Sequence, residues 1–499
     1  METKTGKFSV CSGKTVAGEL QIAGPESRIV LRDDESFLVD DSEPNLCITG
    51  TLYDQTKITL IGCIQTSATS QRGAGEGADS HSVTLFPHFI AQGPMHLEPD
   101  KPTIREISFT FEDVATLFYD FDAFGGAGEA EAFIDAIVKA NEEKFGRKIR
   151  TGPRPEIAYF AGQSLIIEAD TSIGQIRAEH RPSWPIGGPQ GIQIDNQIWV
   201  TITPESPVTL DDAVNRLTSL LRFIAVAVGR TQDLPLFVVR AGTSDASQVV
   251  RVHWSDYPRR VGQVTGALGK PQPGDLPLDS IHRPQEFVAV LKSWLAVNGE
   301  RLVARARIDD TLSQQNHYTV DRLVGAANAF DHLPASAVPR RVDLTPEVAA
   351  AKTACEEIVR ALPKSDERQS LLNDLGRLGK ASLKQKVRYR ARYITTAAGD
   401  KFPSLDFACD QAVNCRNHFV HGSKFDFELD HPSANQSFLT DTLEFVFTAS
   451  ELIEAGWDIR RSLNTPTSMS HPFGSYRMHY EVNLRNLRAC AKPSVHDDP

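Results

Sequence analysis

Apolar and polar residues alternate along the first 120 positions in the way typical of β-strands. Two β-type runs, 46–52 and 57–64, flank a turn-like segment at 53–56 and predict a hairpin. A third run, 104–111, has the alternation of a half-buried strand. These patterns predict a β-rich region over residues 1–120.

Residues 121–314 combine helical and strand-like patterns. A helix is expected at 129–145, and a longer one at 210–228, where Thr209 is a suitable N-cap and Gly229 a C-terminal stop. Five short runs have strand-like composition: 157–160, 164–168, 197–202, 237–240 and 249–254. The sequence therefore predicts a mixed α/β continuation of the N-terminal region.

Only helical patterns follow after about residue 315. Six amphipathic segments succeed one another, at about 318–333, 345–362, 371–378, 383–394, 405–421 and 439–456. The second opens with Thr345 and Pro346 and carries an apolar stripe from Val348 to Leu362. Short-looped amphipathic helices pack into a bundle. We expect an α+β multidomain protein with an all-α bundle at 315–461 and a polar tail at 462–499.

Charge and composition narrow the possible roles. The formal net charge of −11 argues against a protein that coats nucleic acid, but it permits a locally basic groove. No apolar run approaches 18 residues, and the first residues lack an apolar leader, so we expect a cytoplasmic protein without membrane spans. The seven cysteines are scattered without a CxxC pair, which favours reduced thiols. We expect neither a metal site nor a cofactor.

The segment at 405–421 contains the candidate chemistry. It closes with Arg416-Asn417 and, four residues later, His421, directly before Gly422. On a helical wheel Asn417 and His421 lie about 140° and about 180° from Ala412, away from the apolar stripe that ends at Phe419. Two interpretations of His421 stay open at this point: an ordinary solvent histidine, or one that faces a substrate or partner.

These residue types suit RNA cleavage. RNA carries its own nucleophile, the 2′-OH, so a protein must supply a proton-transfer group and a cation for the charge that develops on phosphorus. Histidine titrates near neutral pH, and arginine matches phosphate oxygens with a planar fork. Asparagine can orient the imidazole or bind phosphate. A metal is not required for this chemistry.

A basic strip precedes the motif. Between Asn373 and Tyr393 the only acidic residue is Asp374. Lys384, Arg388 and Arg392 repeat at four-residue spacing and form one row, and Tyr389 and Tyr393 lie beside it with the same spacing. The candidate substrate-binding residues are Lys384, Arg388, Tyr389 and Arg392. Cations that follow phosphates and rings that stack on bases are typical of single-stranded RNA binding. The alternative is an ordinary solvated helix face.

The motif resembles the catalytic sequence of HEPN domains, in which an arginine, commonly followed by a polar residue, precedes a histidine by four to six positions. The resemblance implies a metal-independent endoribonuclease with Arg416, Asn417 and His421 at its centre. It also implies a homodimer, because HEPN ribonucleases bring two such motifs together in one cleft.

The N-terminal half adds a wider resemblance. Gly18-Glu19-Leu20, the strand pair at 47–51 and 58–63, and the strand at 107–111 resemble the N-terminal domain of the ApeA-type abortive-infection family. The resemblance implies a bacterial anti-phage protein whose ribonuclease is restrained until the N-terminal region senses a phage-derived trigger.

Two further hypotheses compete with an RNA-cutting defence enzyme. One is a non-catalytic HEPN module that binds nucleotide or a partner protein and signals infection. The other is a ligand-binding β region with a helical dimerisation tail.

Overall fold

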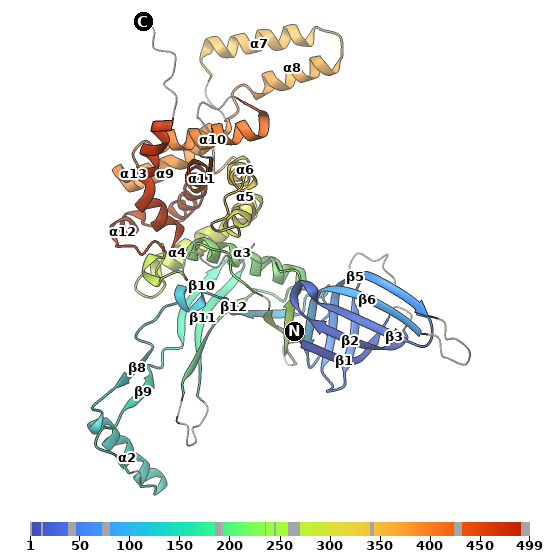
Figure 1. Cartoon of the computed structure of the whole chain (residues 1–499), viewed down its shortest axis with the longest axis vertical. Helices are drawn as coiled ribbons and strands as arrows, with labels where there is room; N and C mark the ends of the chain where they lie inside the picture. The colour runs from blue at the N-terminus through green and yellow to red at the C-terminus, as the bar shows by residue number, and fades with distance from the viewer. Residues whose placement is uncertain are drawn as a thin grey trace. The chain divides into compact units, whose positions relative to one another are not determined.

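The computed structural model describes residues 2–10, 13–37, 46–71, 80–148, 150–184, 191, 193–234, 236–243, 246–257, 270–339, 344–423 and 432–490. The chain forms two compact units. The β unit comprises residues 1–214, 234–257 and 279–284, and the helical unit comprises 215–233, 258–278 and 285–499. A β-rich N-terminal region, a mixed middle and an α-helical C-terminal part confirm the predicted fold class (Figure 1).

Six strands of the β unit close into an antiparallel barrel. They are β1 (Glu2–Ser9), β2 (Thr15–Ile22), β3 (Arg28–Asp33), β4 (Ile48–Leu52), β5 (Lys57–Gln71) and β6 (Ser80–Gly93). The strand order is β6-β3-β2-β1-β4-β5, and β5 pairs again with β6, which removes both free edges. The predicted hairpin is confirmed, since Ile48 lies opposite Leu60 across β4 and β5.

Alternate residues of these strands fill the barrel with apolar side chains. Phe8, Leu20, Ile29 and Leu60 are all fully buried there. Gly50 makes room for the Phe8 ring, because a Cβ at this position would lie 2.3 Å from a ring carbon.

The sheet continues beyond β6 through six more strands. These are β7 (Ile104–Phe109), β10 (Leu165–Thr171), β11 (Gly174–Ser183), β12 (Asp195–Thr203), β13 (Leu236–Ala241) and β14 (Gln248–Trp254), in the order β10-β11-β12-β7-β13-β14-β6. The short helix α1 (Val114–Leu117) follows β7. A separate pair, β8 (Phe124–Ala127) and β9 (Ile157–Phe160), flanks helix α2 (Glu131–Phe145), which has no buried residue.

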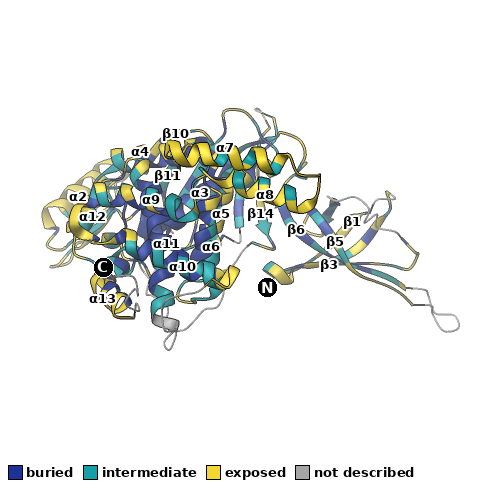
Figure 2. Ribbon diagram, turned by 90° about the horizontal axis from the view of Figure 1, so that it is seen from above, coloured by how far each residue is buried: buried dark blue, intermediate teal, exposed yellow. Residues whose placement is uncertain are grey.

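The helical unit is organised around α11 (Pro432–Glu454). This helix contacts α5 (Asn298–Leu312), α6 (Val320–Asp331), α9 (Leu383–Ala398), α10 (Leu405–His421) and α13 (Pro472–Cys490). The unit also includes most of α3 (Leu210–Val228), α4 (Pro284–Ala296) and α12 (Ile459–Asn464). Figure 2 shows α11 largely buried. None of the described helices is both long and apolar enough to span a membrane.

Buried charges tie α11 to its neighbours. The carboxylate of Glu451 accepts hydrogen bonds from Arg301 and Arg305 of α5 and from Arg390 of α9. All four side chains are almost fully shielded from solvent. Their mutual pairing satisfies charges that would be costly to bury alone.

Two predictions about the helical part were wrong. Helix α7 (Pro346–Arg360) begins as predicted, with the Thr345 side chain accepting from the Val348 backbone N–H, but its apolar stripe does not enter the bundle. Neither α7 nor α8 (Asp366–Arg377) contains a buried residue, and Ile358 is 66% exposed (Figure 2). The supposed polar tail contains α13, which buries Tyr476, Tyr480, Leu484 and Leu487.

Candidate functional site

The last turns of α10 carry the Arg416, Asn417 and His421 side chains. The buried face of this helix runs from Leu405 to Cys415, and no later residue is buried. Gly422 ends the helix in the left-handed region, with φ of 65°, and its N–H donates to the His418 carbonyl. The C-terminal end of α10 therefore extends beyond its packed part and presents its side chains outward.

Arg416 links the three predicted site residues. Its Nη1 lies 3.1 Å from Asn417 Oδ1 and 3.0 Å from His421 Nε2. Arg416 and Asn417 are half-buried, whereas His421 is exposed. The predicted outward orientation of His421 and its proximity to a guanidinium are both confirmed.

The contact defines the hydrogen-bonding role of the imidazole. A guanidinium has only donors, so Nε2 of His421 is the acceptor and carries no proton in this arrangement. The proton of a neutral ring then lies on Nδ1. When a substrate hydroxyl replaces Arg416 as the partner of Nε2, this unprotonated nitrogen can accept the proton of the hydroxyl.

Asn328 of α6 completes the cluster and was missed by the sequence analysis. Its Oδ1 accepts from Arg416 Nη2 at 2.9 Å, across 88 positions of the chain. Nε of Arg416 is buried without a hydrogen-bond partner among the described residues. Asn328 thus holds one terminal nitrogen of the guanidinium, while His421 contacts the other. The only local signal was a polar residue between two fully buried alanines, Ala327 and Ala329.

The neighbouring residues of α10 have supporting roles. His418 donates from Nδ1 to the Ser423 carbonyl at 2.8 Å and so fastens the chain after the helix. Burial raises the pKa of the Cys415 thiol to about 11, which keeps it protonated at neutral pH. Phe419, expected in the core stripe, is 38% exposed, because the end of α10 passes beyond the helices that cover its earlier turns.

The four predicted substrate-binding residues all lie on α9, but they differ in availability. Arg388 makes a two-pronged ion pair with Asp410 of α10, which raises the pKa of Arg388. Arg392 is exposed and Lys384 half-buried, and among the described residues neither side chain has a hydrogen bond or ion pair. Tyr389 packs edge-on against Tyr393, with ring centroids 5.8 Å apart.

The pairing of α9 with α10 orders this strip. The two helices are joined by a short connection and run antiparallel, with Arg388 beside Asp410. Lys384 therefore lies toward the end of α10 that carries His421. Arg392 lies about two turns further along α9 than Lys384, away from that end. Arg390, also in this stretch, is fully buried against Glu451 and Glu454.

Comparison with known families identifies the helical part first. The family model described as Apea-like HEPN matches residues 324–460, which include most of α6 and all of α9, α10 and α11. HEPN domains are typically nucleases, and the Arg416–His421 pair lies within the matched residues.

The N-terminal match defines the family. The model described as ApeA N-terminal domain 1 matches residues 3–294, more than half of the chain. The chain therefore belongs to the ApeA family, whose members fit a role in antiviral defence. No curated protein and no solved structure matches the chain.

Proposed function

We propose that this ApeA-family protein is a metal-independent endoribonuclease of anti-phage defence, with its active site at the end of α10. The observation that carries the proposal is the single guanidinium of Arg416 in contact with both Asn417 and His421. It supports the proposal because one phosphodiester can replace these contacts and engage the cation and the imidazole together.

The reaction needs a base, an acid and a cation. The 2′-OH attacks the adjacent phosphorus and loses its proton, while the 5′-oxygen of the next nucleotide leaves and gains one. His421 acts as the acid or the base, and Arg416 stabilises the extra negative charge on the non-bridging oxygens. Asn417 orients the Arg416 fork through its Oδ1. The products are a 2′,3′-cyclic phosphate and a 5′-hydroxyl end.

We propose that two chains form the complete site. In-line attack places the entering and leaving oxygens on opposite sides of phosphorus, and one α10 supplies only one outward histidine of the motif. A homodimer through the HEPN domain would bring a second His421 to the same phosphate. Light scattering at micromolar protein concentration should give twice the chain mass, and a monomeric enzyme that cleaves RNA would contradict this step.

The α9 strip is proposed to bind the substrate. Lys384 and Arg392 would contact phosphates, Tyr389 would stack on a base, and Arg388 would act only when it leaves Asp410. Replacing Lys384 and Arg392 with alanine should weaken RNA binding. It should also reduce the salt dependence of binding, because each lost phosphate contact lowers the slope of log K against log salt concentration. Replacing the exposed Lys364 and Arg307 together provides a control of equal charge outside the strip.

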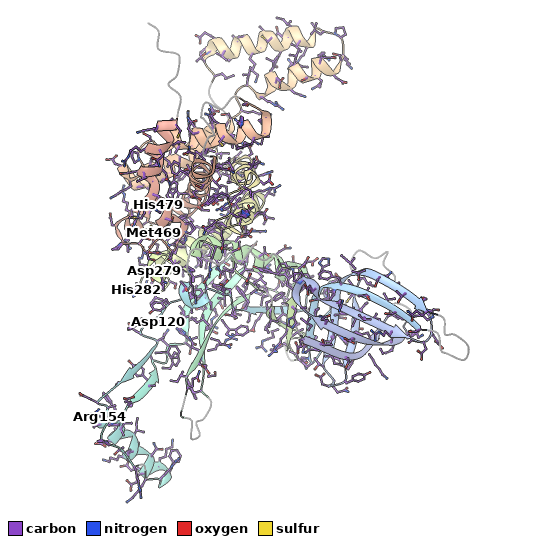
Figure 3. All side chains as sticks on the ribbon, in the orientation of Figure 1. Asp120, Arg154, Asp279, His282, Met469 and His479 are labelled. Atoms are coloured by element: carbon purple, nitrogen blue, oxygen red, sulfur yellow. The ribbon has the colours of Figure 1, made fainter. Side chains whose placement is uncertain are left out.

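The test compares site variants with matched surface variants. Arg416→Ala and His421→Ala should each slow cleavage by about 100-fold or more, the usual scale for proton transfer and charge stabilisation. The controls are the exposed Arg307 of α5 and His479 of α13 (Figure 3), each changed to alanine. Circular dichroism verifies folding. Wild-type cleavage by a folded His421→Ala variant would remove the site assignment.

The β unit is proposed to restrain the nuclease until it meets a phage-derived trigger. Support comes from family membership, since the ApeA N-terminal match covers this unit. Expression in bacteria should be tolerated before infection and should arrest growth after it, and the arrest should require His421. If a His421→Ala variant protects as well as the wild type, a non-catalytic signalling module becomes the better explanation.

A further inference from the structure

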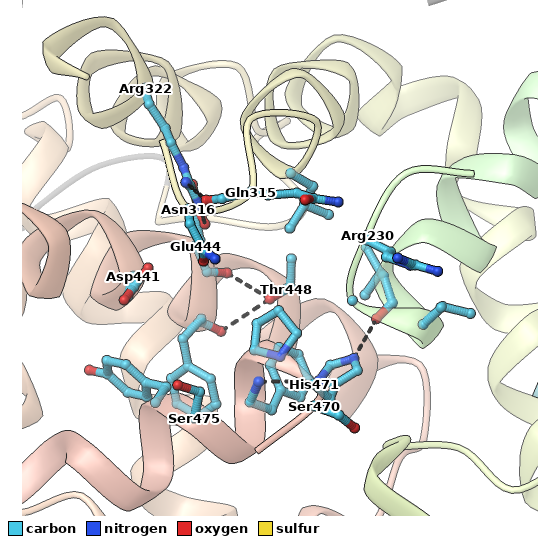
Figure 4. A pocket seen from close by; sticks show the side chains of 18 of the residues that line it. Arg230, Gln315, Asn316, Arg322, Asp441, Glu444, Thr448, Ser470, His471 and Ser475 are labelled. Atoms are coloured by element: carbon cyan, nitrogen blue, oxygen red, sulfur yellow. Dashed lines mark hydrogen bonds and ion pairs between the residues drawn. The ribbon is translucent and has the colours of Figure 1, made fainter. Parts of the chain in front are cut away.

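The helical unit contains a cavity apart from the nuclease residues. It has a volume of about 300 Å³ and lies between the end of α3, the connection from α5 to α6, α11 and the start of α13 (Figure 4). Arg416, Asn417 and His421 do not line it. The cavity is therefore separate from the proposed nuclease site, and its volume is that of pockets that hold small organic ligands.

Two charged residues in the lining of the cavity neutralise each other. Arg322 and Glu444 form a two-pronged ion pair, in which both hydrogen bonds measure 2.8 Å. Arg322 also donates to the Gln315 carbonyl, and its guanidinium lies over the Tyr318 ring, 4.5 Å from the centroid. This pair adds no net charge to the cavity, and its own contacts satisfy it without a ligand.

Asp441 of α11 carries a charge that the described residues leave unpaired. One of its carboxylate oxygens accepts from the Tyr318 hydroxyl at 2.8 Å. The other oxygen has no hydrogen bond or ion pair from any described residue, although Asp441 lines the cavity. Burial, with Glu444 nearby, raises the pKa of Asp441 to about 7. A cation at the free oxygen would offset the cost of an ionised carboxylate in these surroundings.

Aromatic side chains lie next to Asp441. Phe445 is one helical turn further along α11, so its side chain neighbours that of Asp441 on the same face. The Phe445 and Tyr476 rings lie 4.5 Å apart in a stacked arrangement, and both line the cavity. The Tyr476 hydroxyl is 3.0 Å from the hydroxyl of Thr442, the residue that follows Asp441. A ligand whose ring touches these side chains can therefore reach the Asp441 carboxylate through a short chain.

The other ionisable groups of the lining do not oppose a cation at Asp441. His471 is neutral, because burial lowers its pKa to about 4. The Tyr318 and Tyr476 hydroxyls stay protonated, because burial raises the pKa of each. Arg230 has an interaction of its own, and Figure 4 shows it on the right of the view and Asp441 on the left. The unpaired charge at this end of the cavity is therefore negative.

From this arrangement we propose that the cavity binds a small organic ammonium ion that carries an aromatic ring. One N–H of the ammonium group donates to the free oxygen of Asp441, and the ring packs against Phe445 and Tyr476. The charge-assisted hydrogen bond orients the ligand, and cation–π attraction to a neighbouring ring strengthens its binding. A neutral ligand of the same shape keeps the ring contacts and loses both attractions. The site is independent of RNA cleavage, and binding is measured without RNA.

The test is calorimetric titration of the full-length protein with 2-phenylethylamine at pH 8, where the amine is protonated. The matched ligand is 2-phenylethanol, which has the same ring and chain but a neutral hydroxyl group. The amine should bind saturably, and the alcohol should bind at least about tenfold more weakly, because a hydrogen bond to a charged group is the stronger one. The absence of saturable amine binding, or equal affinities for the two ligands, would overturn the proposal.

The pH dependence of binding gives a second readout. Asp441 takes up a proton in the free protein as the pH falls from 8 to 6, whereas the amine stays charged. The affinity for the amine should therefore fall severalfold over this interval, and the affinity for the alcohol should not. An amine affinity that is the same at both pH values would contradict binding at Asp441.

One isosteric change assigns the charge to Asp441. Asp441→Asn keeps the shape of the side chain and removes its negative charge, so it should lower the amine affinity at pH 8 by at least about tenfold and abolish the pH dependence. Unchanged alcohol binding and an unchanged circular dichroism spectrum would show that the cavity is intact. The control of equal charge, the exposed Asp400→Asn, should bind the amine like the wild type. Unchanged amine affinity in Asp441→Asn would remove Asp441 from the site and refute the proposal.

Discussion

Replacing Glu451 with alanine should destabilise the helical unit more than any other single loss of charge in it. Glu451 is the shared acceptor of Arg301, Arg305 and Arg390. Without it, Arg301 and Arg390 keep their contacts with Glu454, but Arg305 loses the only carboxylate that it contacts among the described residues. Removing one partner of a buried pair costs about 3–5 kcal/mol, a large part of a typical domain stability.

The loss of stability in Glu451→Ala is expected to come mainly from Arg305. Burial lowers the pKa of Arg305 to about 10, even though Glu451 acts in the opposite direction. After the substitution its guanidinium would keep only the Trp294 carbonyl, the Asn298 side chain and the Trp294 ring, whose centroid lies 3.8 Å away. Urea unfolding can be followed by tryptophan fluorescence, to which Trp294 contributes as one of the chain's five tryptophans.

Glu454→Ala is the matched control. Glu454 contacts two of the same arginines but is 27% exposed, and both arginines retain Glu451 when it is removed. We expect a loss of about 1–2 kcal/mol for this variant, in the range of a partly exposed charged hydrogen bond. Equal losses for the two variants would show that Glu451 is not the centre of the network.

Three further predictions concern separate parts of the helical unit. Asp441→Asn should be more stable than the wild type at pH 8, by roughly 2–4 kcal/mol. The pKa of Asp441 is about 7 in the folded protein and 3.8 when unperturbed, so the free energy of unfolding of the wild type should fall as the pH rises from 4 to 7. The difference in free energy of unfolding between the two proteins should therefore vanish near pH 4. A pH-independent difference would contradict this prediction. Ile358→Ser should change stability by less than about 0.5 kcal/mol because this side chain is exposed, whereas Leu443→Ala should lose about 2–5 kcal/mol, as thermal melts would show. Asn328→Ala should lower kcat for RNA cleavage about tenfold with little change in KM, because it positions Arg416, and Asn328→Asp should restore part of the loss; an unaltered kcat would assign Asn328 a structural role only.

Local patterns predicted the parts of the structure that local chemistry determines. The limits of α10 were predicted correctly because an apolar stripe begins at Leu405 and Gly422 ends the helix. The outward position of His421 follows from the same periodicity. Helix α13 was missed although Tyr476, Tyr480, Leu484 and Leu487 are spaced as one helical face, because its many polar residues lower its overall hydrophobicity.

Contacts between distant segments were beyond the sequence. The stripe of α7 shows that this helix is amphipathic, but periodicity does not reveal that no bundle helix covers it. The hydrogen bond between Arg416 and Asn328 and the ion pair between Arg388 and Asp410 join residues from different helices. The cavity beside Asp441 requires four chain segments to meet, and no local motif marks it.

The chemistry of the RNA ends tests the central claim most directly. Full-length protein, incubated with single-stranded RNA in excess EDTA, should yield fragments with 2′,3′-cyclic phosphate and 5′-hydroxyl ends, and His421→Ala should yield none. Fragments that carry 5′-phosphate, or cleavage that EDTA abolishes, would show that water or a metal-bound hydroxide attacks, and would contradict a site built on Arg416 and His421.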